Sequence, residues 1–396
     1  MNWSTLNITI ETPMFLGGAI RESCQPDTQF VPSVRGALRS WFRALVGATT
    51  TSPAELLRLE GSVFGAATDD GGGGQSQVHI RLGKQRATVN RDANTCPRWL
   101  GPNANDPARK WLGYLLGQGL FTPGNQDEAA RLRRDYVDAG QHLELLVRAS
   151  DDQTRCALAA SMWALQRFGG IGSRSRKGWG TIRIGDVSSG SWTDTERRWL
   201  SEPFAVEVND VVDVTTRVFQ RPPSQLTPGS LTPYAMLAEG AYAEHSIDHI
   251  WTSWQGALVT LGEEWRRARA TREVDTARYE PKLKTPEWLD TVASGGRGSF
   301  GLGALGLPVQ FKQNVNVTSY VDGAEARLAS PVLFRVHQRA DQKWSATVTA
   351  FHSASLPPGG TIKRNNTTPL GLPDVDARTR LDGAVHAVVA GCISAS

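Results

Sequence analysis

A glycine-rich segment at residues 169–180 constrains this chain more than any other stretch of the sequence. Its twelve residues include five glycines and three cations, Arg174, Arg176 and Lys177, with no acidic residue among them. Glycine allows backbone angles closed to other residues, and N–H groups exposed in this way form sites for anions. Arginine matches the forked geometry of phosphate oxygens. The segment therefore predicts a loop that holds a polyanion's backbone; the alternative is a basic turn in solvent.

The spacing of these glycines excludes two familiar phosphate-binding loops. The segment reads G-h-G-x5-G-h-G, where h is apolar, and it follows a predicted helix and precedes a predicted strand. A dinucleotide-binding loop needs the opposite order, and a P-loop needs a glycine five residues before Gly-Lys-Ser/Thr. Residues 296–301 match G-x-G-x-x-G by letter but lack the preceding strand. We therefore expect no cofactor and no metal.

Length and composition indicate a two-domain globular protein. The chain has 396 residues, of which 40% are hydrophobic and 21% charged, as is usual for soluble domains. Its four cysteines form no C-x-x-C pair, its start lacks a signal-like pattern, and it has no apolar run of membrane-spanning length. These features predict a cytoplasmic protein with no membrane partner. Residues 1–190 hold 22 Lys+Arg against 17 Asp+Glu, which indicates a polyanionic partner for this half.

The first half has the pattern of a ferredoxin-like unit. Its strands are predicted by alternation of apolar and polar residues, and its helices by apolar residues on one face. Ser33, after Pro32, is the expected N-cap of the first helix. The predicted elements are, in order, a strand at 6–10, a helix at 33–46, strands at 78–82 and 143–147, a helix at 151–168 and a strand at 181–184. This order is βαββαβ.

The first predicted helix carries a stripe of arginines beside its apolar face. Arg35, Arg39 and Arg43 recur every four residues, and no carboxylate at helical spacing within the helix neutralises them. The alternatives are a solvated face and contact with phosphates. Met14 and Phe15, which follow the first strand, either stack on bases or plug the edge of the core.

The second half repeats a similar rhythm of elements. Predicted strands lie at 204–208, 211–219, 333–336, 346–351 and 384–389, with a helix at 247–269 and a second glycine-rich loop at 295–306. We therefore expect an α+β protein with two fused ferredoxin-like domains, 1–190 and 200–396. The insertion at 91–128 has no assigned role.

Several of these motifs together resemble the RAMP proteins of CRISPR systems. Residues 12–18 (TPMFLGG), residues 32–43 (PSVRGALRSWFR) and the glycine-rich loop carry the resemblance in the first half. Residues 303–311 (GALGLPVQF) and 327–332 (RLASPV) carry it in the second half. Among RAMP proteins, the chain looks most like the family of the first subunit of the Cmr (type III-B) effector complex.

This resemblance implies two RRM-like domains in a multi-subunit complex for antiviral defence. Guide RNA, target RNA and other Cmr subunits are the implied partners, with the subunit near the guide 3′ end and the target 5′ end. The aromatic pairs of an RNP-type RRM sheet are not evident. The residues implied to bind RNA are Met14, Phe15, Arg35, Arg39, Arg43, Gly170, Gly172, Arg174, Arg176 and Lys177.

Catalysis is the competing class of function. Some RAMP relatives cut guide-precursor or target RNA, and Asp27, with Glu22 nearby, occupies the region of their aspartate. The first histidine, His79, comes too late for the acid–base histidine of guide-processing relatives. His245 and His249, if one helical turn apart, are a candidate metal pair without a third ligand. We expect no enzyme; a scaffold that contacts only protein subunits is a third option.

Overall fold

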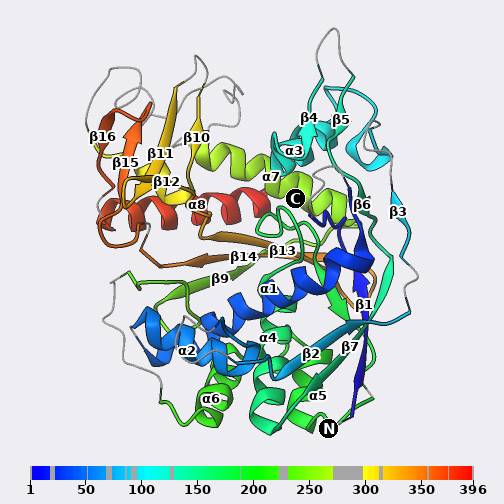
Figure 1. The fold of residues 1–396 in the computed structure, drawn as a ribbon. Coiled ribbons are helices and arrows are strands. Elements are labelled where there is room, and N and C mark those ends of the chain that lie inside the picture. The colour runs from blue at the N-terminus through cyan, green and yellow to red at the C-terminus, as the bar shows by residue number, and fades with distance from the viewer. Residues whose placement is uncertain are drawn as a thin grey trace.

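The structure is a computed structural model that joins two α+β halves (Figure 1). It describes residues 2–17, 23–50, 52–67, 74–84, 87–90, 96–124, 129–187, 189–222, 231–270, 298–311, 315–354, 356–372 and 374–394. The helices are α1 (Pro26–Val46), α2 (Pro53–Phe64), α3 (Pro107–Leu116), α4 (Asp152–Phe168), α5 (Asp194–Ser201), α6 (Val208–Val218), α7 (Trp254–Ala270) and α8 (Asp374–Ser394). Within the described ranges, no helix is long and apolar enough to cross a membrane.

The strands form sheets of four, five and three strands and two short two-stranded sheets. In the first part of the chain they are β1 (Ser4–Ile10), β2 (Val78–Leu82), β3 (Val89–Asn90), β4 (Phe121–Thr122), β5 (Arg131–Leu132), β6 (Tyr136–Val137), β7 (His142–Ala149) and β8 (Ile182–Ile184). In the rest they are β9 (Tyr242–Ser246), β10 (Val309–Gln310), β11 (Asn316–Val321), β12 (Ala324–Ala326), β13 (Val332–Gln338), β14 (Trp344–Phe351), β15 (Thr361–Arg364) and β16 (Thr368–Leu370).

The first half has the predicted ferredoxin-like topology. Its antiparallel sheet has the strand order β2-β7-β1-β8, and Leu6 of β1 pairs with Leu145 of β7. Alternate residues of β1 are buried, and α1 and α4 pack against that face through one hydrophobic core. Strand β8 pairs with β1 at the edge of the sheet. The glycine-rich segment connects α4 to β8 and therefore lies at that edge.

The second half contains most of a second ferredoxin-like unit. Strand β9, helix α7, strands β13 and β14 and helix α8 follow one another, and the sheet order is β13-β14-β9. This is the ferredoxin-like order without a fourth strand in the described part of the chain. Helices α7 and α8 lie side by side over this sheet, and β10, β11, β15 and β16 form a separate sheet at their end (Figure 1). Both halves are therefore α+β, as expected.

The two halves are interleaved rather than merely joined. Helices α5 and α6 pack into the core of the first half, and α3, from the insertion at 91–128, packs on α7 of the second half. Trp179 of the glycine-rich segment also belongs to the second core. The boundary at residues 190–200 stays a prediction.

Five local predictions were wrong. Residues 204–208 do not form the predicted strand, because they are a turn that leads into helix α6. Helix α1 begins at Pro26, because Gln29 folds back on the Gln25 backbone N–H (2.8 Å), and the Ser33 hydroxyl donates within the helix. Residues 211–219 and 384–389 are helical, in α6 and α8; their buried positions follow a helical period although they are rich in valine. The predicted helix at 247–269 begins only at Trp254.

Candidate nucleic-acid interface

The glycine-rich loop, residues 169–180, folds as a closed and largely buried loop. The Ile171 N–H donates to the Gly180 carbonyl (2.8 Å), and Gly180 has a φ of 65°. A Cβ on Gly180 would lie 2.0 Å from the Ile171 carbonyl oxygen, and one on Gly172 would lie 2.5 Å from that of Phe15. Glycine is therefore required at both positions for close backbone approach, and the loop is not a turn in solvent.

The tip of the loop is docked on strand β13 of the second half. The Phe334 N–H donates to the Arg176 carbonyl (3.1 Å), and the Arg176 guanidinium donates to the Ser330 carbonyl (2.8 Å). The Lys177 ammonium donates to the Ser330 hydroxyl and to the Val332 carbonyl, both at 3.3 Å. The loop cations are thus held by uncharged oxygens, which leave their positive charge unneutralised.

Five cations from different parts of the chain gather around this loop: Arg174, Arg176, Lys177, Arg269 and Arg327. They line two adjoining cavities of about 560 and 790 Å³, which share Arg174, Lys177 and Arg269. No aspartate or glutamate lines either cavity, and among the described residues none of the five cations pairs with a carboxylate. We call these two cavities the basic groove.

Burial and the mutual repulsion of the cations in the basic groove lower the pKa of Arg174 and of Lys177. Burial lowers the pKa of the Arg174 guanidinium, and the charges of Arg327 and Arg269 lower it further. Burial also lowers the pKa of the Lys177 ammonium well below its ordinary value, and the charges of Arg269, Arg176 and Arg174 add to this. It costs electrostatic free energy to bring these like charges together with no carboxylate from the described residues between them. A bound anion reduces that cost.

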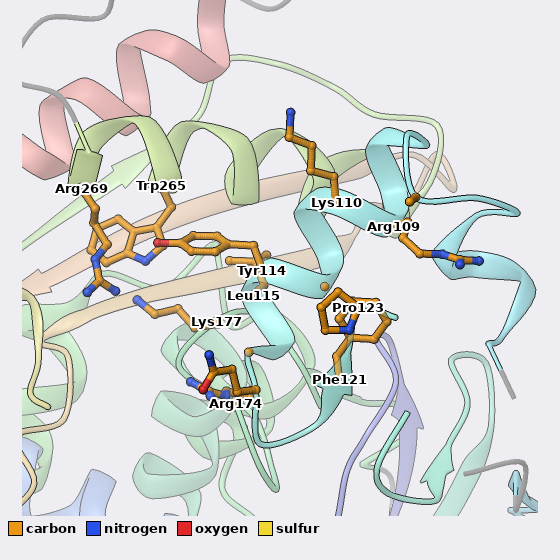
Figure 2. A pocket seen from close by; sticks show the side chains of 14 residues that line it. Arg109, Lys110, Tyr114, Leu115, Phe121, Pro123, Arg174, Lys177, Trp265 and Arg269 are labelled. Atoms are coloured by element: carbon orange, nitrogen blue, oxygen red, sulfur yellow. The ribbon is translucent and has the colours of Figure 1, made fainter. Parts of the chain in front are cut away.

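Aromatic side chains form one wall of the groove (Figure 2). Trp265 of α7 lies under the Lys177 ammonium, 4.0 Å from nitrogen to ring centroid, and Tyr114 of α3 lies half-exposed beside it. In Figure 2 the ends of Arg174, Lys177 and Arg269 lie near these rings. Trp265 is buried, so the groove combines cations for phosphates with one accessible ring, that of Tyr114, for a base.

The predicted α1 arginines lie in a different environment from the loop cations. Glu60 of α2 is buried and pairs with both Arg39 (2.7 Å) and Arg43. Arg39 also donates to the carbonyls of Phe64 and Gly65. No carboxylate within α1 neutralises the stripe, but one from the next helix does. The half-buried Arg35 has no ion pair in the described part of the chain.

Helix α1 does contact the glycine-rich loop, but through its apolar face. A cavity of about 300 Å³ lies between them, lined on the loop side by Gly170 and Arg176. On the α1 side it is lined by Ser40 and Trp41, and none of the three stripe arginines borders it. The predicted pairing of loop and helix is present, whereas the stripe itself lies on another face of α1.

Met14 and Phe15 are completely buried. The Phe15 ring packs on Trp179 and Tyr136, with centroids 5.7 and 5.5 Å away, and the Phe15 carbonyl accepts the Ser173 N–H (2.8 Å). Of the two interpretations of this pair, the structure matches the plug of the core. Gly170 and Gly172 shape the loop backbone behind the cations.

The residues considered for catalysis do not form a cluster. Asp27 is exposed in the first turn of α1, and Glu22 lies outside the described residues. His245 is in strand β9 and His249 in the following loop, so they are not one helical turn apart. Within the described residues, no group of three histidine, cysteine or acidic side chains could hold a metal.

Sequence reasoning missed Arg269, Arg327, Tyr114 and Trp265. Arg327 begins the 327–332 motif, which was noted only for its resemblance. Arg269 lies in the last turn of α7, where Glu263 and Glu264 nearby in the sequence offset its charge. Tyr114 lies in the unassigned insertion. No local sequence pattern links these four residues to the loop. Tyr114, Trp265 and Arg269 come near it because α3 packs on α7.

Comparison with known proteins agrees with the fold and the loop. Residues 7–183 match the family model of the RAMP superfamily, which includes β1, α1, α4 and the glycine-rich loop. This part of the chain is therefore similar to proteins of the RAMP superfamily.

Within that superfamily the chain is similar to Cmr1 subunits. It is 28% identical over 218 residues to CRISPR system Cmr subunit Cmr1-1 of Pyrococcus furiosus, covering 52% of this chain and 56% of that relative, little more than half its length. It is 25% identical over 180 residues to Cmr1-2 of the same organism, covering 44% of this chain and 90% of that one. The crystal structure of apo Cmr1 from P. furiosus shares the fold, with a TM-score of 0.56 and 19% identity over 96% of this chain and 97% of that one.

Proposed function

We propose that this chain is a non-catalytic, RNA-binding subunit of a type III-B CRISPR effector complex. The observation that carries the proposal is the basic groove beside the glycine-rich loop, which no aspartate or glutamate of the described residues lines. Five cations without carboxylate partners among the described residues favour a polyanion, and the adjoining half-exposed ring of Tyr114 favours single-stranded RNA over other polyanions. The similarity to Cmr1 subunits supplies the class of complex.

In this proposal guide RNA and target RNA are the ligands, and other Cmr subunits are the protein partners. The phosphates lie against Arg174, Arg176 and Lys177, with Arg35, Arg39 and Arg43 further along the RNA path. The position near the guide 3′ end follows from the family resemblance alone.

The test is the salt dependence of binding to a single-stranded RNA oligonucleotide. Arg174→Glu with Arg269→Glu should weaken binding about a hundredfold at low salt, at roughly tenfold for each lost charge-assisted contact. The slope of log affinity against log salt should become shallower by about 1.4, because two phosphate contacts are lost.

The matched control reverses two exposed arginines away from the groove, Arg58 and Arg198. This control has the same net charge and should bind RNA nearly as well as the wild type. Equal losses in both variants would show that only net charge matters, which contradicts the proposed groove. RNA incubated with the wild type and Mg²⁺ should stay intact; cleavage that Asp27→Ala abolishes would support a nuclease instead.

A further inference from the structure

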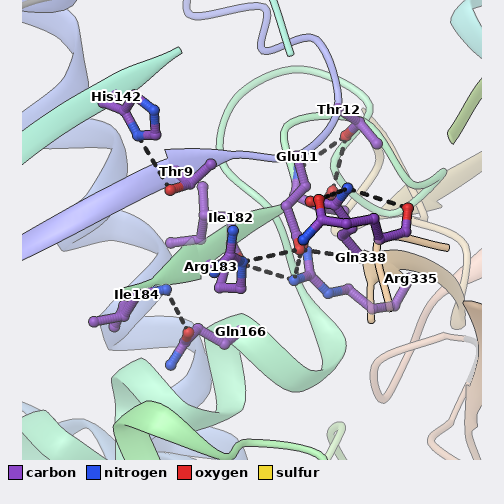
Figure 3. Close-up of polar contacts among 12 residues, drawn as sticks. Thr9, Glu11, Thr12, His142, Gln166, Ile182, Arg183, Ile184, Arg335 and Gln338 are labelled. Atoms are coloured by element: carbon purple, nitrogen blue, oxygen red, sulfur yellow. Dashed lines mark hydrogen bonds and ion pairs between the residues drawn. The ribbon is translucent and has the colours of Figure 1, made fainter. Parts of the chain in front are cut away.

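A buried ion pair joins the two halves of the molecule behind the glycine-rich loop. Glu11, immediately after β1, accepts a hydrogen bond from the Arg335 guanidinium of β13 (Nη2–Oε2, 2.7 Å), and each side chain is only 2% exposed. Figure 3 shows the Glu11 carboxylate between Arg335, Gln338 and Arg183. The Gln338 N–H donates to Glu11 (3.0 Å), and Arg183 lies 3.7 Å from it.

The same guanidinium holds both ends of the glycine-rich loop. Arg335 donates to the Ile182 carbonyl (2.6 Å), just after the loop, and to the Gly169 carbonyl (3.5 Å), at its start. Thr12, the residue after Glu11, also forms hydrogen bonds to the loop backbone. Its hydroxyl donates to the Gly178 carbonyl (2.8 Å) and accepts the Thr181 N–H (3.0 Å). The buried polar groups therefore fasten the loop at four backbone positions.

This arrangement is costly to bury. Desolvation raises the pKa of the Glu11 carboxyl and lowers that of the Arg335 guanidinium, and the attraction between the two opposes both changes. Apolar side chains of similar volume often give equal stability in place of a buried ion pair. What they cannot supply is a set of directed donors to chosen carbonyls, and here those carbonyls belong to the loop.

We propose that Glu11 and Arg335 are positioning residues for the RNA-binding loop. They fix the ends of the loop relative to β13, so that Arg174, Arg176 and Lys177 face the basic groove before RNA arrives. Groups held in place in advance lose less entropy on binding, which strengthens it. Neither residue contacts RNA. The inference rests on the proposed RNA-binding function, and it assigns the clamp a role in binding beyond its role in stability.

The experiment compares two carboxylate-to-amide variants, Glu11→Gln and Glu244→Gln. Glu244 of β9 pairs with Arg167 of α4 (2.8 Å), with side chains 13% and 12% exposed, and so also joins the two halves. It makes no hydrogen bond to the 170–182 backbone. The three readouts are melting temperature, hydrogen–deuterium exchange of peptides covering 169–182 in RNA-free protein, and the Kd for a single-stranded RNA oligonucleotide.

Both variants should lower the melting temperature. Only Glu11→Gln should speed exchange across 169–182 and raise the Kd, by about tenfold, because the side chains of the loosened loop must be ordered when RNA binds. Equal changes in loop exchange and in Kd for the two variants would overturn the positioning role, because the clamp would then act only through stability.

A second variant separates loss of the clamp from loss of stability, in case Glu11→Gln fails to fold. Glu11→Leu with Arg335→Met replaces the pair by apolar side chains and should recover much of the melting temperature while the Kd stays raised. Recovery of wild-type affinity in this variant would overturn the inference. If wild-type protein binds no RNA, the proposed function fails, and loop exchange alone then decides whether the clamp exists: unchanged exchange in Glu11→Gln would exclude it.

Discussion

The glycine-rich loop and helix α1 each carry three cations, yet the two sets have different partners. Arg176 and Lys177 donate to carbonyl and hydroxyl oxygens of residues 330–332, which carry no charge. Arg39 and Arg43 share the buried carboxylate of Glu60. The first set keeps its positive charge for a ligand, whereas the second has most of its charge neutralised within the protein.

The difference shows that a cationic pattern indicates a binding surface only when its partners are known. A helix stripe is judged in sequence by acids three or four residues away, but Glu60 comes from the next helix. In the loop the reverse holds, because the nearest groups across the interface are backbone carbonyls and further arginines. Availability of charge is therefore a property of the packing between elements.

Among the variants that test this comparison, removal of the α1 stripe is expected to change RNA affinity the most. Arg35, Arg39 and Arg43 are changed to glutamine together with Glu60→Gln, so that no carboxylate is left buried without a partner. RNA binding should weaken about tenfold, less than for the loop pair, because within the described residues Arg39 and Arg43 already pair with Glu60, whereas Arg35 has no ion pair. Filter binding at low salt measures this change.

Circular dichroism melting provides the control for that variant. An unchanged Kd in a folded protein would remove the stripe from the proposed RNA path and leave it as the anchor of α2. A loss equal to that of the loop variant would contradict the distinction between the two sets.

The fold of the first half was predictable because its patterns are local. Alternation in β1 and helical spacing in α4 predict these elements directly, and their order predicts the sheet. In the second half, α6 and the end of α8 were predicted as strands because valine favours strands intrinsically. Tertiary packing overrides that preference: Val211, Val212 and Thr215 are buried on one face of a helix.

The candidate site was predictable only in part, for a related reason. The loop can be predicted from the sequence because its glycines and arginines lie close together in it. The groove also needs Arg269, Arg327 and Tyr114, which reach it from α7, the 327–332 segment and α3. The clamp between Glu11 and Arg335 spans 324 positions, and no local pattern marks either residue.

An intermediate effect is expected at the aromatic wall of the basic groove. Tyr114→Ala should weaken RNA binding about fivefold, at the lower end of the roughly 1–3 kcal/mol for a base stacked on an aromatic ring. Tyr114→Phe keeps the ring and should bind as the wild type does. Quenching of a 2-aminopurine base in the oligonucleotide reports stacking directly, and equal quenching with Tyr114→Ala would exclude the ring from base contact.

The smallest effect expected is a dependence of RNA binding on pH that belongs to the loop alone. The pKa of Lys177 is lowered in the free protein by burial and by Arg269, Arg176 and Arg174. A phosphate placed among these cations favours the protonated form, so RNA binding raises this pKa and takes up protons. As pH rises through the lowered pKa, free protein loses the Lys177 charge and affinity falls, by only about threefold because the arginines stay charged.

Lys177→Arg is the matched variant, since guanidinium remains protonated over this range. Calorimetry at pH 8 in two buffers of different ionisation enthalpy should detect proton uptake with the wild type and none with Lys177→Arg. The α1 arginines cannot produce such uptake for the same reason. Equal uptake in both proteins would place the titrating group outside the loop and would mean that phosphates do not approach Lys177, which removes the feature that distinguishes the loop from the stripe.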